Sequence, residues 1–373
     1  MNVFFLGAGF SRPAGLPLGE GLFLEILEIA KSRGLYEENL KHDINEYLDY
    51  YCAKTGKTIT EDLINLEELM SYVDINNNLA LHGPHTSSVQ IILKNLIAYV
   101  LHNCETKITD KQFSLYEHFV ERLGPQDVIF TFNYDTILEK TLYRKNIPYR
   151  LYEHRYRYDE QNNDLVSDWK NEVTIFKMHG SINWFDRTDY DETKKIWEEM
   201  GNGIPPHAVF DGRMNVEIHS LLDNPFPPRH FFRNVYIAEN LENYFIHSKF
   251  RNEVPVIVPP SYHKLVNLNY LSDFWYRFSD VTVTINKVAI IGFSLPAHDE
   301  YIRQPLYWYI KNFHERGELL IEKKPKLRII DYKKGKREIS NFKENYRFVN
   351  EKMTDFYFKG FSEEALDFIF SED

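Results

Sequence analysis

Apolar and polar positions divide the chain into short hydrophobic runs and longer stretches with helical spacing. The runs are rich in branched and aromatic residues and are typical of buried strands; they lie at 3–6, 128–132, 173–178, 256–258, 288–291 and 327–330. Helical spacing of apolar residues is found at 18–33, 136–144, 268–278 and 300–316. Strands that alternate with helices predict an α/β domain with a Rossmann-like parallel sheet.

Two long segments interrupt this alternation. Residues 36–123 keep helical spacing, and we interpret 36–110 as a helical insertion. Residues 186–250 combine mixed charge with several prolines, and we interpret them as a second, irregular insertion. The predicted organisation is a domain at 1–345 that contains both insertions, followed by a tail at 346–373 with one amphipathic helix near 363–370.

Four predicted strands end in a small cluster of polar or glycine residues. Open parallel sheets bind ligands in the crevice beyond the carboxyl ends of their strands, so we expect these clusters to meet at one site of nucleotide size. The insertion at 36–110 is expected to cover this crevice. The clusters are Gly7-Ala8-Gly9-Phe10-Ser11, Asn133-Tyr134-Asp135, His179-Gly180-Ser181 and Gly292-Phe293-Ser294.

Each cluster also has an ordinary structural explanation. Gly7 and Gly9 let backbone N–H groups approach a pyrophosphate, but they also suit a plain turn between a strand and a helix. Asn133 and Asp135 are residue types that cap helices. A lone histidine such as His179 is often structural, and the glycine turn at 292–294 suits a tight turn. Their shared placement at strand ends favours the functional interpretation.

The charge balance narrows the classes of partner. The 373 residues include 44 basic and 55 acidic ones, a net charge of -11, which argues against unaided binding of nucleic acid. A local basic patch that receives a nucleotide is compatible with this balance. The basic stretch at 333–337 is predicted to be a solvated hairpin.

Cysteine and histidine usage gives no sign of a metal site. Cys52 and Cys104 are the two cysteines and form no C-x-x-C pair, so we expect neither a disulfide framework nor a zinc site. His82 and His85 lack carboxylate or cysteine neighbours. The chain starts without a basic leader, and no run approaches the ~20 apolar residues of a membrane span. We therefore expect a cytoplasmic protein that does not contact a membrane.

Taken in order, the motifs resemble those of the sirtuin fold. The similarity covers roughly residues 1–335 and depends on Gly7, Gly9, Ser11, Gly15 and Pro17, on Thr131 to Asp135, on His179-Gly180 and on Gly292-Phe293-Ser294. The chain is more similar to bacterial sirtuin-like NAD hydrolases of anti-phage defence than to protein deacetylases. Deacetylases carry a glutamine where Phe132 stands, and they carry a four-cysteine zinc module that two cysteines cannot supply.

This resemblance implies a hydrolase that cleaves the nicotinamide–ribose bond of NAD to give nicotinamide and ADP-ribose, without a metal. Asn133 would orient the attacking water and hydrogen-bond the ribose, and His179 would act as the general base. Asp135 would position the ribose or the Asn133 loop, and Asp331 would contact the adenosine side. The other implied contacts are the backbone of Gly7, Ala8, Gly9, Phe10 and Ser11 with the pyrophosphate, and Gly292, Phe293 and Ser294 with phosphate and adenosine ribose.

Other functions stay open at this point. The same pocket could bind NAD or ADP-ribose as a signal and regulate a partner protein without turnover. A deacylase or an ADP-ribosyltransferase would use the same fold, and a scaffold subunit would act by assembly. The resemblance also implies a homo-oligomer, or a partner ATPase or helicase-like defence protein, with activity that is silent in the isolated chain.

Overall fold

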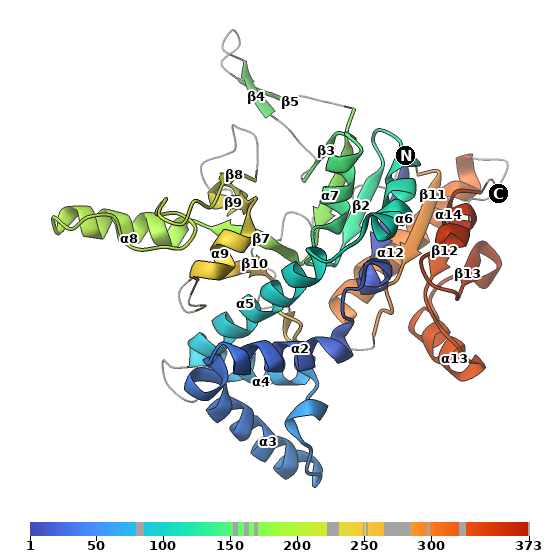
Figure 1. Ribbon diagram of the computed structural model, residues 1–373. Coiled ribbons are helices and arrows are strands. Elements are labelled where there is room, and N and C mark those ends of the chain that lie inside the picture. The colour runs from blue at the N-terminus through green and yellow to red at the C-terminus, as the bar shows by residue number, and fades with distance from the viewer. Residues whose placement is uncertain are drawn as a thin grey trace.

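The computed structural model contains a seven-stranded sheet with helices on both faces (Figure 1). It describes residues 1–79, 86–151, 156–159, 164–167, 171–221, 231–248, 250, 253–264, 285–296, 299–320 and 326–371. The strands are β1 (Asn2–Leu6), β2 (Val128–Thr131), β3 (Tyr149–Arg150), β6 (Val173–Lys177), β11 (Lys287–Ile291), β12 (Leu327–Ile330) and β13 (Thr354–Tyr357). Every neighbouring pair in the order β13-β12-β11-β1-β2-β6-β3 is parallel, which confirms the predicted Rossmann-like α/β class.

The strand order changes direction at β1. β2 and β6 lie on one side of β1, and β11, β12 and β13 lie on the other, so the topological switch point is between β1 and β11. Leu6, the last residue of β1, pairs with Ile291 of β11 on one side and with Thr131 of β2 on the other. Ligands of open parallel sheets bind outside the strand ends at such a switch point. The turns that follow Leu6 and Ile291 therefore mark the expected binding edge.

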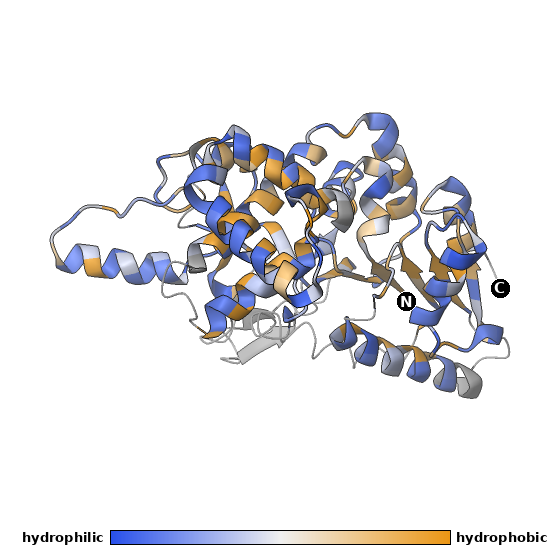
Figure 2. Ribbon diagram, turned by 90° about the horizontal axis from the view of Figure 1, so that it is seen from below, coloured by the Kyte–Doolittle hydropathy of each residue, from blue (hydrophilic) through white to orange (hydrophobic). Residues whose placement is uncertain are grey.

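Alternate residues of β1 enter separate hydrophobic cores on the two faces of the sheet. The first core includes residues of α2 (Gly19–Ser32), α5 (Thr86–Glu105), α6 (Asp110–Glu121), α7 (Ile137–Arg144) and α14 (Glu363–Phe370), among other helices. The second core includes residues of α12 (Glu300–Leu320) and α13 (Lys336–Asn345). Phe4 belongs to the first core and Phe5 to the second, and both are fully buried. Such continuously apolar strands are typical of parallel sheets covered on both faces, and Figure 2 shows the hydrophobic residues gathered on the strands.

Helices fill most of the predicted insertion at 36–110. They are η2 (Tyr36–Leu40), α3 (Lys41–Thr55), η3 (Glu61–Leu63), α4 (Leu66–Leu79) and α5. Asn95 of α5 donates its Nδ2 hydrogen bond to the Glu253 carbonyl oxygen at 2.6 Å, and the Tyr262 backbone N–H donates to Ser71 Oγ at 2.8 Å. These bonds tie the helices to residues 253–264.

A second, smaller sheet follows β6 directly. Its antiparallel order is β10-β7-β9-β8, formed by β7 (Gly180–Asp186), β8 (Ile218–Ser220), β9 (Val235–Ala238) and β10 (Pro255–Ile257). The chain enters it at Gly180, whose φ of +78° lets the backbone turn out of the large sheet. The strand predicted at 256–258 exists as β10, in this second sheet. Between β7 and β8, α8 (Thr188–Glu199) projects from the body (Figure 1); a separate hairpin pairs β4 (Tyr156–Asp159) with β5 (Asp164–Ser167).

The region after β12 differs from the sequence-based expectation in two ways. The stretch 333–337 is not a hairpin: Gly335 caps α13, which begins at Lys336 and buries Phe342 in the second core. The segment predicted as a tail contributes β13 to the large sheet, in addition to the expected helix α14. The helix predicted at 268–278 lies outside the described residues. Within the described residues, no helix is long and apolar enough to cross a membrane.

Candidate functional site

The turns after β1 and β11 are in direct backbone contact. The Gly7 N–H donates to the Ile291 carbonyl at 2.9 Å, and the Gly9 N–H donates to the Gly292 carbonyl at 2.8 Å. A Cβ on Gly9 would lie 2.6 Å from the Gly292 Cα, and Gly292 itself has a φ of +63°. Glycine is therefore required in both turns, because the two backbones meet without room for a side chain.

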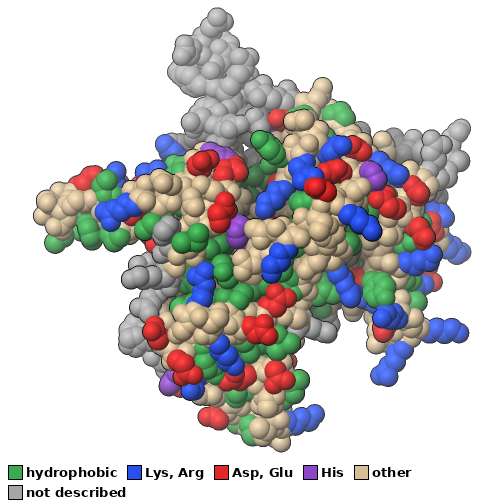
Figure 3. All heavy atoms as spheres, in the orientation of Figure 1, with side chains coloured by type: hydrophobic (Ala, Val, Ile, Leu, Met, Phe, Trp, Pro, Cys, Tyr) green, Lys and Arg blue, Asp and Glu red, His purple; other side chains and the backbone are tan. Residues whose placement is uncertain are grey.

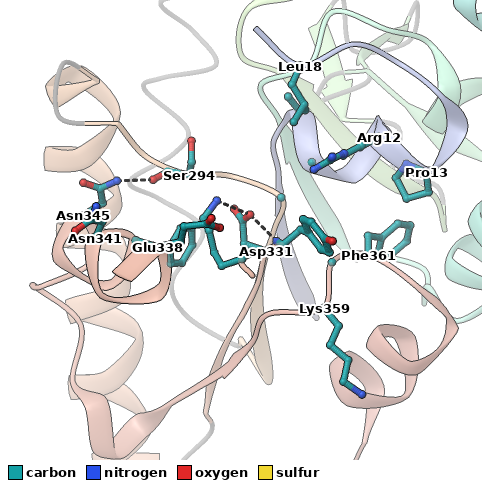
Figure 4. A pocket seen from close by; sticks show the side chains of 17 residues that line it. Arg12, Pro13, Leu18, Ser294, Asp331, Glu338, Asn341, Asn345, Lys359 and Phe361 are labelled. Carbon is teal, nitrogen blue, oxygen red and sulfur yellow. Dashed lines mark hydrogen bonds and ion pairs between the residues drawn. The ribbon is translucent and has the colours of Figure 1, made fainter. Parts of the chain in front are cut away.

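A cavity of about 1030 Å³ opens at this switch point (Figure 4). Its walls come from the residues that follow β1, β11, β12 and β13, and from one side of α13. The lining residues are Ala8, Gly9, Arg12, Pro13, Leu18, Gly292, Ser294, Asp331, Tyr332, Lys333, Glu338, Asn341, Phe342, Asn345, Lys359, Gly360 and Phe361. The helices at 36–105 contribute none of these lining residues. The insertion was expected to cover the crevice, but its described residues do not line this cavity.

Charged side chains of both signs line the cavity. Asp331, which ends β12, accepts hydrogen bonds on Oδ1 from the Tyr332 N–H at 2.6 Å and from Lys333 Nζ at 3.0 Å. Lys359 pairs with Glu364 at 3.0 Å. The Asp331 carboxylate therefore already has partners, and a sugar hydroxyl would have to use its remaining acceptor positions.

On the other side of β1, three polar side chains form a buried chain of hydrogen bonds. Asn133 Nδ2 donates to the Gly7 carbonyl at 3.0 Å and to Ser11 Oγ at 3.1 Å. Ser11 Oγ in turn donates to Asp135 Oδ2 at 2.7 Å. This network ties the turn after β2 to the turn after β1. Both amide hydrogens of Asn133 are used in it, so Oδ1 is the atom of this side chain left to act on a ligand.

Burial makes the Asp135 carboxyl hard to ionise. Desolvation, helped by the nearby Glu105 carboxylate, raises the pKa of Asp135 to about 6. Its Oδ1 also accepts from the Ile137 N–H at 3.2 Å, which forms an Asx turn directly before α7, whose N-cap residue is Thr136. Lys177 lies close by and donates to the Asp135 carbonyl oxygen at 2.5 Å and to Glu139 at 2.7 Å.

His179 is buried at the junction of the two sheets. Its Nδ1 lies 3.0 Å from the Phe132 carbonyl oxygen, and its Nε2 lies 2.8 Å from the Tyr301 hydroxyl. A carbonyl oxygen only accepts, so Nδ1 carries the proton and Nε2 accepts from Tyr301. The Phe132 ring stacks on Phe293 with centroids 4.5 Å apart, which packs the turn after β11 against this region.

The surroundings of His179 keep its imidazole neutral. Burial, together with the positive charge of Lys264, lowers the pKa of His179 to about 3. Lys264 forms a buried ion pair with Asp299 at 2.9 Å and lies over the Tyr301 ring at 5.6 Å from its centroid. The first turn of α12, which carries Tyr301, is thereby held against His179.

The predicted site residues fall into four groups. Ala8, Gly9, Gly292, Ser294 and Asp331 line the cavity. Gly7, Ser11, Asn133 and Asp135 belong to the hydrogen-bonded network, while Phe10 and Phe293 are buried in the two cores. His179 bonds to different partners from those of Asn133, so a joint action of the two on one sugar stays a prediction.

Sequence reasoning missed Arg12, Tyr332 and Tyr301. Arg12 and Tyr332 line the cavity, and the Arg12 guanidinium lies 5.1 Å from the centroid of the Tyr332 ring. Arg12 directly follows Ser11 and Tyr332 directly follows Asp331 in the sequence. Their position next to predicted site residues could therefore have indicated them. Nothing local marks Tyr301, because it meets His179 across 122 positions of chain.

Potential metal ligands cluster away from this cavity. In the described part of the chain, His42, Asp43 and Glu46 on α3 bring three ligand atoms within 4.8 Å of one another. They lie at the surface of one helix and include no deeply buried group, so this cluster carries no assignment.

One family model matches part of the chain. Residues 127–201, which run from just before β2 to just after α8, match the family model of the SIR2-like domain. This segment includes Asn133, Asp135 and His179. The match supports the resemblance to sirtuins and indicates an NAD-related activity. No curated protein matches the chain.

Proposed function

We propose that this protein hydrolyses NAD at the nicotinamide–ribose bond and releases nicotinamide and ADP-ribose. The observation that carries the proposal is the pairing of a nucleotide-sized cavity at the switch point with a polar network that begins in the same β1 turn. The SIR2-like match over β2 and β6 supports it. Water adds to the ribose carbon as the C–N bond breaks, the bonding electrons leave with neutral nicotinamide, and one water proton passes to a base.

Asn133 is the residue that we assign to orienting the water. Its two amide hydrogens are donated to Gly7 and Ser11, which fixes the plane of the amide. Oδ1 is then held in one direction and can accept a hydrogen bond from a water or from a ribose hydroxyl. Positioning of this kind lowers the entropic part of the barrier.

His179 is the residue that we assign as the base, and its surroundings set a condition on that role. The neutral imidazole has a lone pair on Nε2, as a base requires, but the Tyr301 hydroxyl occupies it. A pKa of about 3 also makes the imidazole a weak base in this conformation. Proton transfer to Nε2 therefore requires Tyr301 to give way to a sugar hydroxyl or a water.

The test is release of nicotinamide from NAD by the purified protein, followed by chromatography, alone and with the product of a neighbouring gene. Asn133→Ala and His179→Ala are each expected to lower the rate by ~10²-fold or more. His42→Ala on α3 and Asn78→Ala on α4 are matched controls, because both side chains are exposed and lie outside the network. Turnover by His179→Ala at the wild-type rate would remove the assignment of the base.

A binding function without turnover is the second candidate. The occupied Nε2 of His179 favours it, because a pure sensor of NAD or ADP-ribose needs no free base. Calorimetry that shows tight NAD binding, with no nicotinamide released under any activator, would select this alternative.

We place this activity in bacterial anti-phage defence, where NAD depletion would stop growth of the infected cell. The proposal includes assembly as a homo-oligomer or with a partner ATPase or helicase-like protein. It is supported by the four strand-end motifs, which resemble that branch in order and in residue type. The assay with a neighbouring gene product, described above, also tests this context.

A further inference from the structure

Arg12 occupies a distinctive place in the cavity. It starts the short helix η1 (Arg12–Ala14) directly after Ser11, and its side chain extends into the cavity (Figure 4). The Tyr332 ring supports the guanidinium from one side, at 5.1 Å between the guanidinium carbon and the ring centroid. Such stacking restricts a long side chain while its N–H donors stay available.

The backbone amides of the neighbouring glycine turn are largely used within the protein. The N–H groups of Gly7 and Gly9 donate to Ile291 and Gly292, and the N–H of Phe10 donates to Gly7. A phosphate at this turn would therefore find few backbone donors. A bound phosphate would therefore need a side chain with several N–H donors in place of the expected cradle of backbone N–H groups.

The other cations of the cavity already have anionic partners. Lys333 is paired with Asp331 at 3.0 Å, and Lys359 is paired with Glu364 at 3.0 Å and extends away from Arg12 in Figure 4. No carboxylate of the described residues pairs with Arg12. Arg12 is therefore the cation of the cavity that is best able to take up an incoming anion.

We propose that Arg12 binds the diphosphate of a nucleoside 5′-diphosphate group in this cavity. The planar guanidinium matches two phosphate oxygens and forms charge-assisted hydrogen bonds. The inference rests on the proposed function for the identity of the whole ligand, but it concerns the diphosphate alone. Lys and Arg side chains that gather over α13 (Figure 3), among them exposed Lys334, Lys336 and Arg337, make this side of an acidic protein attractive to such an anion.

The test measures binding of ADP and of adenosine by calorimetry to the full chain and its variants. Arg12→Gln is expected to weaken ADP binding by ~10-fold to ~100-fold and to leave adenosine binding within ~2-fold, since adenosine has no phosphate. Arg12→Lys is expected to restore part of the ADP affinity, because an ammonium supplies the charge without the planar pair of donors. Arg337→Gln is the matched control, since it removes an exposed arginine on α13 that does not line the cavity.

Three results would overturn the proposal. These are an equal loss of ADP affinity in Arg12→Gln and Arg337→Gln, an equal loss for ADP and adenosine in Arg12→Gln, and failure of the wild-type protein to bind ADP. The readout is independent of catalysis. ADP binding that depends on Arg12, without any nicotinamide release, would overturn the proposed hydrolase and keep the diphosphate site. Nicotinamide release by the wild type, with ADP affinity unchanged in Arg12→Gln, would keep the hydrolase and overturn the diphosphate site.

Discussion

The strand ends on the two sides of β1 lie in different environments, although all of these strands belong to one parallel sheet. Beyond β11, β12 and β13 the edge is an open cavity of about 1030 Å³ lined by charged side chains. Beyond β2 and β6 the polar side chains of Asn133, Asp135 and His179 are each less than a tenth exposed. Asn133 and Asp135 are hydrogen-bonded to Ser11, and His179 is hydrogen-bonded to Tyr301. The first side is suited to hold a ligand, and the second holds polar groups rigidly.

Under the proposed function, this contrast would separate ligand binding from the chemical step. Charged side chains of both signs line the cavity, whereas burial shifts the pKa values of Asp135 and His179 on the other side in opposite directions. Perturbed groups of this kind are found at active sites as well as in structural networks. The turn from Gly7 to Ser11 touches both sides, so it is the place where a bound nucleotide would meet the polar network.

The largest expected effects come from two glycines in close backbone contact: Gly292, where the two sides of β1 meet, and Gly180, where the chain enters the second sheet. Gly292→Ala would place a Cβ against the backbone of Gly9 at a φ of +63°, and Gly180→Ala would overlap the Val256 carbonyl oxygen at a φ of +78°. Each change is expected to lower the free energy of unfolding by ~3 to ~5 kcal/mol, measured by urea denaturation.

Gly203→Ala is the control for both, because a Cβ there meets no atom within 4 Å. Its free energy of unfolding is expected to stay within about 1 kcal/mol of the wild type. A loss at Gly180 but none at Gly292 would mean that the contact between the β1 and β11 turns is loose, and the two sides would then be less tightly joined than described.

A second prediction uses pH to distinguish the two perturbed groups. The pKa of Asp135 rises from 3.8 to about 6, so its contribution to stability is complete below pH 3.8 and is lost as pH rises through about 6. The pKa of His179 falls from 6.5 to about 3, so its contribution is complete above pH 6.5 and is lost as pH falls through about 3. The two side chains therefore contribute slopes of opposite sign between these limits.

Urea denaturation of Asp135→Asn and His179→Asn between about pH 4 and about pH 6 measures these slopes. Relative to wild type, Asp135→Asn is expected to gain stability toward higher pH, by up to about 3 kcal/mol over the interval, and His179→Asn to gain stability toward lower pH. Parallel profiles for wild type and both variants would show that neither group is buried as described, and the contrast between the two sides would fail.

The smallest effect is expected from Tyr301→Phe. It removes one buried hydrogen bond, to His179 Nε2, and is expected to cost ~1 to ~2 kcal/mol of unfolding free energy. Because it frees the lone pair of Nε2, nicotinamide release is expected to be retained or to increase. Tyr307→Phe, on the same helix and in contact with Trp308 and Phe348, is the control. A loss of turnover as large as in His179→Ala would show that the Tyr301 hydroxyl relays the proton, accepting it from the water while passing its own proton to His179 Nε2.

The sequence predicted the central part of the fold because its strands carry a strong local signal. The apolar runs at 3–6, 128–132, 173–178, 288–291 and 327–330 all lie in the large sheet. β13 has a weaker pattern, with Asp355 in its middle and a place at the sheet edge, so it did not stand out. The charges of 333–337 suggested solvent exposure, but the buried Phe342 that follows makes this segment the start of a helix.

The candidate site was predictable only where its residues directly follow strongly apolar strands of the large sheet. The glycine turn and the turn at Gly292 were found because strand ends are informative positions. Arg12 was passed over because one exposed arginine resembles any other until its neighbours are known. Tyr301 and Lys264 reach His179 from distant parts of the chain, and a single sequence contains no record of such contacts.

The edge strand and the last helix have a consequence for the order of events during synthesis. Gly360 and Phe361 form part of the cavity wall, and the Phe361 ring packs against Phe10 with centroids 4.7 Å apart. Residues that lie about 350 positions apart, near 10 and near 360, therefore have to meet before the cavity is complete. While residues 360 and 361 are still inside the ribosome, the nascent chain lacks this wall, so the cavity closes only after the segment that follows β13 has emerged.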